Sequence, residues 1–397
     1  MTNQHESQPQ DTSRRDFLRK SALAASAAGA TAALGGGLSP AFAAPQDAGQ
    51  DAPEASNAKN GDTKGPWKIL NAYYFRSHMY TCVPSNIRSD MEWMAQQGTN
   101  AVTISILEQD FDAAVQNVDI ICAEAHRVGI RVHAVPSRWG NLVAGSPKVP
   151  SSWGVKNTQY AALDKKGKPK TTGLGPISSI HYPEVVDFVK DGVERILTQW
   201  PIDGIIWDEP KTLTTQDFSP PAVAKKPAGS DDNWYTDTVA DFFGDVSAHA
   251  KSVKPDVVVS MFVYSSYTQT NPYIVERCAQ IPNIDYFGCD GRPWRMSDDL
   301  GPDGSGQAPY NKVLLPNAGE FIDTARRNGK GGCVLIENFS FDPPETHYLQ
   351  TMERTMPEVV AMRPEHLIYY YYGRSIADPD RAMKITSKVL KDGRAHG

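Results

Sequence analysis

The sequence has little of several features that would mark a specialised class of protein. It holds five cysteines in 397 residues, an odd number without a Cys-x-x-Cys pair, so no disulfide scaffold is expected. Glycine (31) and proline (29) are close to average, which excludes a collagen-like or wholly disordered chain. Basic residues are in the minority: the net charge is −6 and the isoelectric point about 5.9. Nucleic acid and anionic membrane surfaces are therefore not expected as main partners.

The first 43 residues have the pattern of an export signal. Residues 13–20 read SRRDFLRK, an Ala-rich apolar stretch follows to about residue 38, and residues 41–43 read AFA. This order resembles a bacterial twin-arginine signal peptide, which implies cleavage after Ala43 and a periplasmic or secreted protein. A membrane anchor is the alternative, but the stretch contains four glycines and ends in a cleavage site. Residues 44–65 are polar without an apolar rhythm and are expected to be a disordered linker.

From residue 66 onward, short apolar runs alternate with amphipathic patterns. The expected strands are 68–74, 101–106, 130–136, 202–208, 257–263, 284–289, 332–337 and 366–372. The expected helices are 86–97, 111–128, 183–200, 234–253, 272–280, 317–328, 345–362 and 378–390. Eight such units predict one α/β domain over 66–397, a (β/α)8 TIM barrel with long βα loops. An open doubly wound sheet is the alternative, but the first strand leads into YFRS at 74–77 and not into a glycine-rich phosphate turn.

Four acidic side chains end the predicted strands. Asp208 and Glu209 follow the fourth strand, Asp290 the sixth, and Glu337 the seventh. The carboxyl ends of barrel strands meet at one rim, so these residues are expected to converge there. Carboxylates brought close together repel unless one is protonated or a cation lies between them. They therefore indicate acid/base chemistry or a metal site.

Three segments carry a resemblance to a known group of barrels. Residues 126–134 read HRVGIRVHA, residues 182–188 read YPEVVDF, and residues 202–208 read IDGIIWD. These runs resemble segments of glycosyl-hydrolase-like TIM barrels, in which the acid that closes this strand is usually catalytic or substrate-binding. In those barrels the third segment usually ends in Asp-Asp or Asp-x-Tyr, whereas in this chain it ends in Asp208-Glu209-Pro210. The resemblance therefore leaves open which of the two acids acts.

Two catalytic placements follow from that resemblance. Barrels that use strands four and seven would make Glu209 the acid/base and Glu337 the nucleophile. Barrels of the α-galactosidase type use strands four and six, and would make Asp208 the nucleophile and Asp290 the acid/base. The second placement is slightly preferred here, because Asp208 closes the matched segment.

Further side chains near the strand ends are candidates for binding sugar. Tryptophans can stack on sugar faces, and basic or hydroxyl groups can bind sugar hydroxyls or an acidic sugar. Core packing is the competing interpretation for each aromatic residue and for the histidine. The candidates are His133, Arg138, Trp139, Trp207, Arg292, Trp294, Tyr370 and Arg374.

The sequence thus predicts a glycoside hydrolase that acts on a poly- or oligosaccharide without a cofactor or metal. One protonated acid would donate to the glycosidic oxygen, while a carboxylate attacks the anomeric carbon or activates water. A metal-dependent sugar isomerase or epimerase is a rival, although no H-x-H or H-x-x-E-H spacing accompanies His133 and His366. A non-catalytic carbohydrate-binding barrel is the third possibility.

Overall fold

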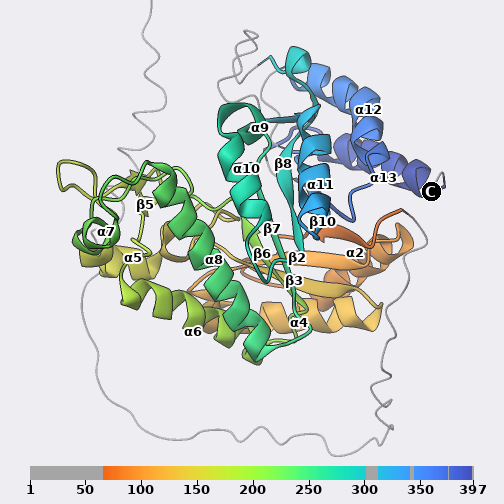
Figure 1. Ribbon diagram of the computed structural model, residues 1–397. Coiled ribbons are helices and arrows are strands. Elements are labelled where there is room, and N and C mark those ends of the chain that lie inside the picture. The colour runs from red at the N-terminus through yellow and green to blue at the C-terminus, as the bar shows by residue number, and fades with distance from the viewer. Residues whose placement is uncertain (1–65, 301–311, 340–343, 374, 396–397) are drawn as a thin grey trace, which may run out of the picture. The chain divides into compact units, whose positions relative to one another are not determined.

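The computed structural model describes residues 66–300, 312–339, 344–373 and 375–395 (Figure 1). Eight parallel strands form a closed barrel, because each pairs with the next along the chain and β11 pairs with β1. The strands are β1 (Ile69–Tyr73), β2 (Ala101–Ile106), β3 (Arg131–Pro136), β6 (Gly204–Asp208), β7 (Val258–Tyr264), β8 (Tyr286–Arg295), β10 (Gly331–Ile336) and β11 (His366–Tyr370). The predicted (β/α)8 barrel is confirmed.

One long helix follows each strand and covers the barrel from outside (Figure 1). The helices are α2 (Pro84–Gln96), α4 (Val115–Arg127), α6 (Pro183–Gln199), α8 (Asn233–Val253), α10 (Pro272–Ala279), α11 (Asn317–Arg327), α12 (Glu345–Ala361) and α13 (Pro379–Ala395). Proline begins α2, α6 and α10, where its fixed φ fits the first turn and no amide hydrogen is needed. Gly98 and Gly129 have positive φ just after α2 and α4, and so end those helices.

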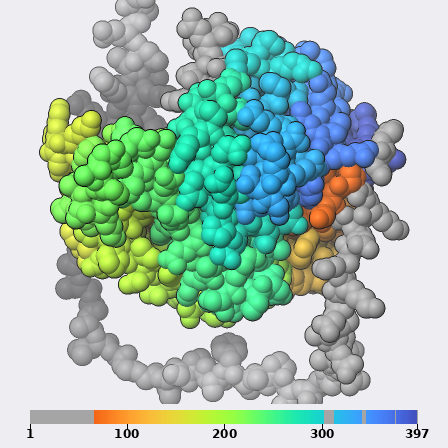
Figure 2. Space-filling view, in the orientation of Figure 1, coloured from red at the N-terminus to blue at the C-terminus, as the bar shows by residue number. Residues whose placement is uncertain are grey.

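The core lies between the strands and these helices. Every residue of β1, β2 and β6 is buried, as expected for strands enclosed on both faces. The space-filling view shows the strands hidden behind the outer helices, among them α8, α10 and α11 (Figures 1 and 2). All five cysteines are free thiols, and all but Cys82 are buried.

The βα loops contain short elements that the apolar rhythm did not predict. They are α3 (Asp110–Ala113), α5 (Ser152–Lys156), the β4–β5 hairpin (Thr171–Thr172, Gly175–Pro176), α7 (Pro220–Lys225), α9 (Tyr267–Thr270) and β9 (Val313–Leu315). Strand β8 runs to Arg295 instead of ending at residue 289, because its outer half pairs with β9. This extension brings the residue just before β9, Lys312, to the rim of the barrel.

The predicted signal peptide (1–43) and linker (44–65) lie outside the described residues. Among the helices of the part that is described, none has both the length and the apolar character needed to cross a membrane.

Candidate active site

A cavity of about 1060 Å³ lies at the carboxyl ends of the barrel strands. Its walls include all four acids that the sequence singled out: Asp208, Glu209, Asp290 and Glu337. They come from three strands, β6, β8 and β10, which are the fourth, sixth and seventh of the barrel. This is the end at which barrels of this architecture place their functional groups.

The backbone at the end of β6 explains how two consecutive acids reach one cavity. Side chains alternate along a strand, so Asp208 faces the barrel interior while Trp207 faces outward to α8. Glu209 would face outward next, but its φ of 43° places it in the left-handed region and turns the chain. Both carboxyl groups consequently line the cavity.

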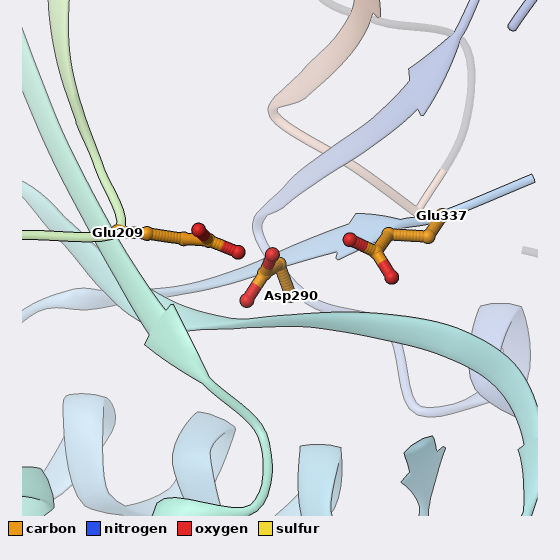
Figure 3. A group of neighbouring side chains, drawn as sticks. All are labelled: Glu209, Asp290 and Glu337. Atoms are coloured by element: carbon orange, nitrogen blue, oxygen red, sulfur yellow. The ribbon is translucent and has the colours of Figure 1, made fainter. Parts of the chain in front are cut away.

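Three of the acids meet around a lysine. Glu209, Asp290 and Glu337 point toward one another, and each has an oxygen within 4.8 Å of the other two (Figure 3). The Lys312 ammonium contacts Glu209 and Asp290, and lies 2.7 Å from Oε1 of Glu337. Burial lowers the pKa of Lys312, but the three acidic side chains together outweigh it and hold the pKa well above its usual value, so Lys312 remains charged. The ammonium therefore supplies the positive charge that a metal ion would otherwise bring to this cluster.

A second lysine lies on the other side of Glu209. Lys211 contacts the Glu209 carboxylate and donates to the Tyr264 hydroxyl at 2.7 Å. Tyr264 ends β7, and both lysine ammoniums lie 4.9 Å from the centre of its ring. Neither lysine was predicted from the sequence, because a single lysine in a long loop gives no pattern that distinguishes it from a solvated one.

The four acids differ in how they hold protons. Burial and then the charge of Glu209 raise the pKa of Asp208 to about 7. Burial and Glu209 also hold the pKa of Asp290 well above its usual value. Burial acts in the same direction on Glu209, but Lys312 and Lys211 outweigh it, so the pKa of Glu209 falls well below its usual value. The interaction between the Glu209 and Asp290 carboxyl groups lowers the pKa of Glu209 and raises that of Asp290.

Aromatic side chains form one wall of the cavity, but they are tyrosines and phenylalanines. Tyr370 packs against Tyr73, Phe75 and Phe339, with ring centres 5.1, 6.0 and 4.1 Å away. Tyr73 also donates to Oδ2 of Asp208 at 3.5 Å. Tyr370 was a sequence candidate, whereas Tyr73, Phe75 and Phe339 were not.

The three candidate tryptophans do not line this cavity, which corrects the expectation that they stack on substrate. The Trp207 indole donates to Ser247 of α8 at 2.9 Å. The ring of Trp139 packs on Phe188 of α6, in space that the missing side chain of Gly192 leaves open. Trp294 stacks on Tyr348 of α12, with ring centres 4.9 Å apart. All three are at most 2% exposed.

His133 is likewise a core residue and not a binding group, which is a second correction. It is fully buried, 3.3 Å from the Asn71 amide, and its ring lies close to the Gly204 backbone. Burial lowers the pKa of His133 to about 3, so the ring is neutral. Arg138 and Arg292 do line the cavity, while Arg374 lies outside the described residues.

No protein-family model and no curated protein sequence matches the chain. Solved structures with the same fold do match the chain. A GH5_18 from Streptomyces cattleya aligns with 83% of this chain and 80% of its own, at 13% identity and a TM-score of 0.51. An endo-1,4-beta-mannanase from Rhizomucor miehei aligns with 83% of this chain and 94% of its own, at 14% identity and a TM-score of 0.50. The catalytic domain of a beta-amylase from Paenibacillus polymyxa aligns with 82% of this chain and 97% of its own, at 10% identity and a TM-score of 0.50. The chain thus has the TIM-barrel fold found in glycoside hydrolases, as the sequence resemblance implied.

Proposed function

We propose that this protein is a glycoside hydrolase whose chemistry takes place among the four carboxyl groups of the cavity. One observation carries the proposal: carboxyl groups from three strands converge in a single cavity, where the surroundings raise the pKa of Asp208 and lower that of Glu209. Hydrolysis of a glycosidic bond needs a proton donor and an ionised carboxylate side by side. The glycoside hydrolase structures that share the fold support the same chemistry.

Asp208 is the proposed general acid. A pKa of about 7 gives it a proton that it can release near neutral pH, which is the condition for efficient acid catalysis. Asp290 is only 2% exposed and contacts both Lys312 and Glu209, so we do not assign it this role. The assignment departs from the preference drawn from the sequence, which made Asp208 a nucleophile. A carboxyl group with a pKa of about 7 is partly protonated at neutral pH, and the protonated form cannot attack the anomeric carbon.

Glu337 is the proposed partner of Asp208 in the reaction. Among the described side chains, Lys312 is the one that bonds Glu337, through Oε1, so Oε2 is left for the anomeric carbon or a water. Glu209 has Lys211, Lys312 and Asp290 as partners, and we assign it to tuning the acid and holding Lys312. The pair thus comes from the fourth and seventh strands.

The test is hydrolysis of a glycan panel by the purified protein, with the first anomer followed by NMR. On the substrate found, we expect Asp208→Asn and Glu337→Gln each to lower kcat by at least about 100-fold. Glu320→Gln, an exposed residue of α11, is the matched control. The proposal fails if no glycan is cleaved, or if both site variants keep full activity. Retention of the anomeric configuration would make Glu337 the nucleophile, and inversion would make it the base that activates water.

We also propose that residues 1–43 direct export through the twin-arginine route, on the strength of the SRRDFLRK and AFA segments. The chain expressed in a twin-arginine-competent bacterium should lose its first 43 residues and accumulate outside the cytoplasm. Replacing Arg14 and Arg15 by lysine should leave it uncleaved inside the cell. N-terminal sequencing of the fractionated protein distinguishes these results, and export of the double variant at normal levels would refute the assignment.

A further inference from the structure

The loop between β3 and α6, residues 137–182, is joined to the end of the strand that carries Asp208. The Ala144 amide donates to the Asp208 carbonyl at 2.7 Å. Around the barrel, β6 is followed by β7, β8 and β10 in one direction and by β3 in the other. Because Glu337 follows β10, the loop lies beyond Asp208 as seen from Glu337.

Part of this loop, the β4–β5 hairpin, reaches the cavity. Thr172 pairs with Gly175, and the turn residues between them, Gly173 and Leu174, line the cavity. The hairpin is held by Asn141, which is only 2% exposed. Its side-chain amide donates to the Thr172 hydroxyl at 2.7 Å and to the Gly175 carbonyl at 3.0 Å. The Thr172 hydroxyl accepts in turn from the Leu174 amide at 3.1 Å, so Asn141 fixes the position of the turn in the cavity wall.

The place of the hairpin corresponds to one half of a bound glycan. The cavity of about 1060 Å³ is as large as the pockets that hold drug-sized molecules, so it has room for more than one sugar ring. In hydrolysis, the acid protonates the oxygen of the departing sugar, while its partner acts on the opposite face of the ring that is kept. With Asp208 as the acid and Glu337 as its partner, the departing sugar extends past Asp208 and away from Glu337. The hairpin lies on that side.

The side chains on this side of the cavity suit a sugar ring that is held by contact and not by stacking. The β3–α6 loop contributes the apolar Leu174 and the small residues Ala144 and Gly145 to the wall, together with the polar Ser146 and Lys148. Leu174 is partly exposed, so its side chain is accessible to a bound molecule. The aromatic wall, by contrast, comes from β1, β11 and the residues that follow β10.

We propose that the hairpin turn binds the departing sugar, with Leu174 as the residue that contacts it and Asn141 as a positioning residue that acts through the turn. The inference rests on the proposed function, which supplies the roles of Asp208 and Glu337. It adds that the departing group is itself a sugar, and it names the element that selects this group.

The test compares two substrates that share the sugar that is kept, once the glycan panel has identified it. One is the unactivated oligosaccharide, and the other is the glycosyl fluoride, whose departing fluoride ion is too small to reach the turn. We expect Leu174→Ala to lower kcat/KM on the oligosaccharide by about fivefold, because apolar contact with the departing sugar is lost, and to leave that on the fluoride unchanged. Asn141→Ala should act in the same selective way. Thr171→Ala is the matched control: it changes an exposed residue of β4 that does not line the cavity, so both substrates should react as with the wild type.

An unchanged kcat/KM on the oligosaccharide in Leu174→Ala, or an equal loss on both substrates, would overturn the inference. In either case the glycoside hydrolase function would stand, because the wild type still cleaves both substrates. A wild type that cleaves neither a glycan nor a glycosyl fluoride would refute the proposed function and, with it, the site for the departing sugar. Equal losses on both substrates in Asn141→Ala alone would remove Asn141 from the positioning role and leave that of Leu174 in place.

Discussion

Replacing Glu209 by glutamine should move the pH dependence of catalysis in a direction fixed by the structure. After burial, the charge of Glu209 is the largest influence that raises the pKa of Asp208. The substitution keeps the shape of the side chain and removes this charge. It also leaves the ammoniums of Lys211 and Lys312 less neutralised, and both of them lower the pKa of Asp208. Both of these changes lower the pKa of Asp208.

The expected size follows from Coulomb's law. Two carboxylates on consecutive residues, about 6 Å apart at an effective dielectric constant of about 20, interact by roughly 3 kcal/mol. That energy corresponds to a decrease of about 2 in the pKa of Asp208. Burial is the largest influence and remains, so we expect the pKa to fall from about 7 to between about 5 and 6.

The assay is the pH profile of kcat/KM, whose basic limb reports the acid of the free enzyme. In the wild type the rate should fall above pH 7, because Asp208 must be protonated to donate. In Glu209→Gln the same fall should begin about 1 to 2 pH units lower. Glu320→Gln should reproduce the wild-type profile. A basic limb that stays in place or moves to higher pH in Glu209→Gln would refute the assignment of Asp208 as the acid.

Three other substitutions test the role of Asp208 as the acid, the ion-pair cluster around Lys312, and the position of Trp207 outside the substrate site. Asp208→Asn should cost less activity on an aryl glycoside with a good leaving group than on an unactivated glycan, because such a group departs without a proton; equal losses in kcat would contradict the role. Lys312→Met leaves three carboxyl groups without their cation and should lower the free energy of unfolding by about 3 to 5 kcal/mol, measured in urea; an unchanged midpoint would count against the ion-pair cluster. Trp207→Phe removes the bond to Ser247 and should cost about 1 kcal/mol while kcat and KM stay unchanged; a raised KM would return Trp207 to the substrate site.

The barrel was predictable because its signals are local. Apolar runs of strand length, prolines at helix starts and glycines at helix ends each depend on a few neighbouring residues, and they placed the ends of the elements within a few residues. The end of β8 is the exception. Residues 290–295 become a strand only because β9, which lies after a long loop, pairs with them. No pattern within the segment itself records that partner.

The same distinction separates the site residues that were predicted from those that were not. Asp208, Asp290 and Glu337 follow apolar strands. The carboxyl ends of barrel strands meet at one rim, so the sequence was enough to predict that these three side chains lie near one another. Lys312 reaches them through the pairing of β8 with β9, which the sequence does not reveal.

The tryptophans were misplaced for a different reason. A position next to a strand end does not determine which way the side chain faces. The direction of each tryptophan side chain depends on packing partners far along the chain. Trp139 fills the space beside Gly192, Trp207 bonds Ser247, and Trp294 stacks on Tyr348.

The lysine at the centre of the carboxyl cluster gives the site an internal counter-ion that dissolved ions do not replace. Its side chain is 18% exposed, and the carboxylates around it are no more exposed than that. Mobile ions screen charges in water far better than they screen groups packed together in this way. Ionic strength should therefore leave the bond-breaking step almost untouched. A kcat that stays constant as salt is added is the expected result, and a kcat that falls with added salt would contradict it.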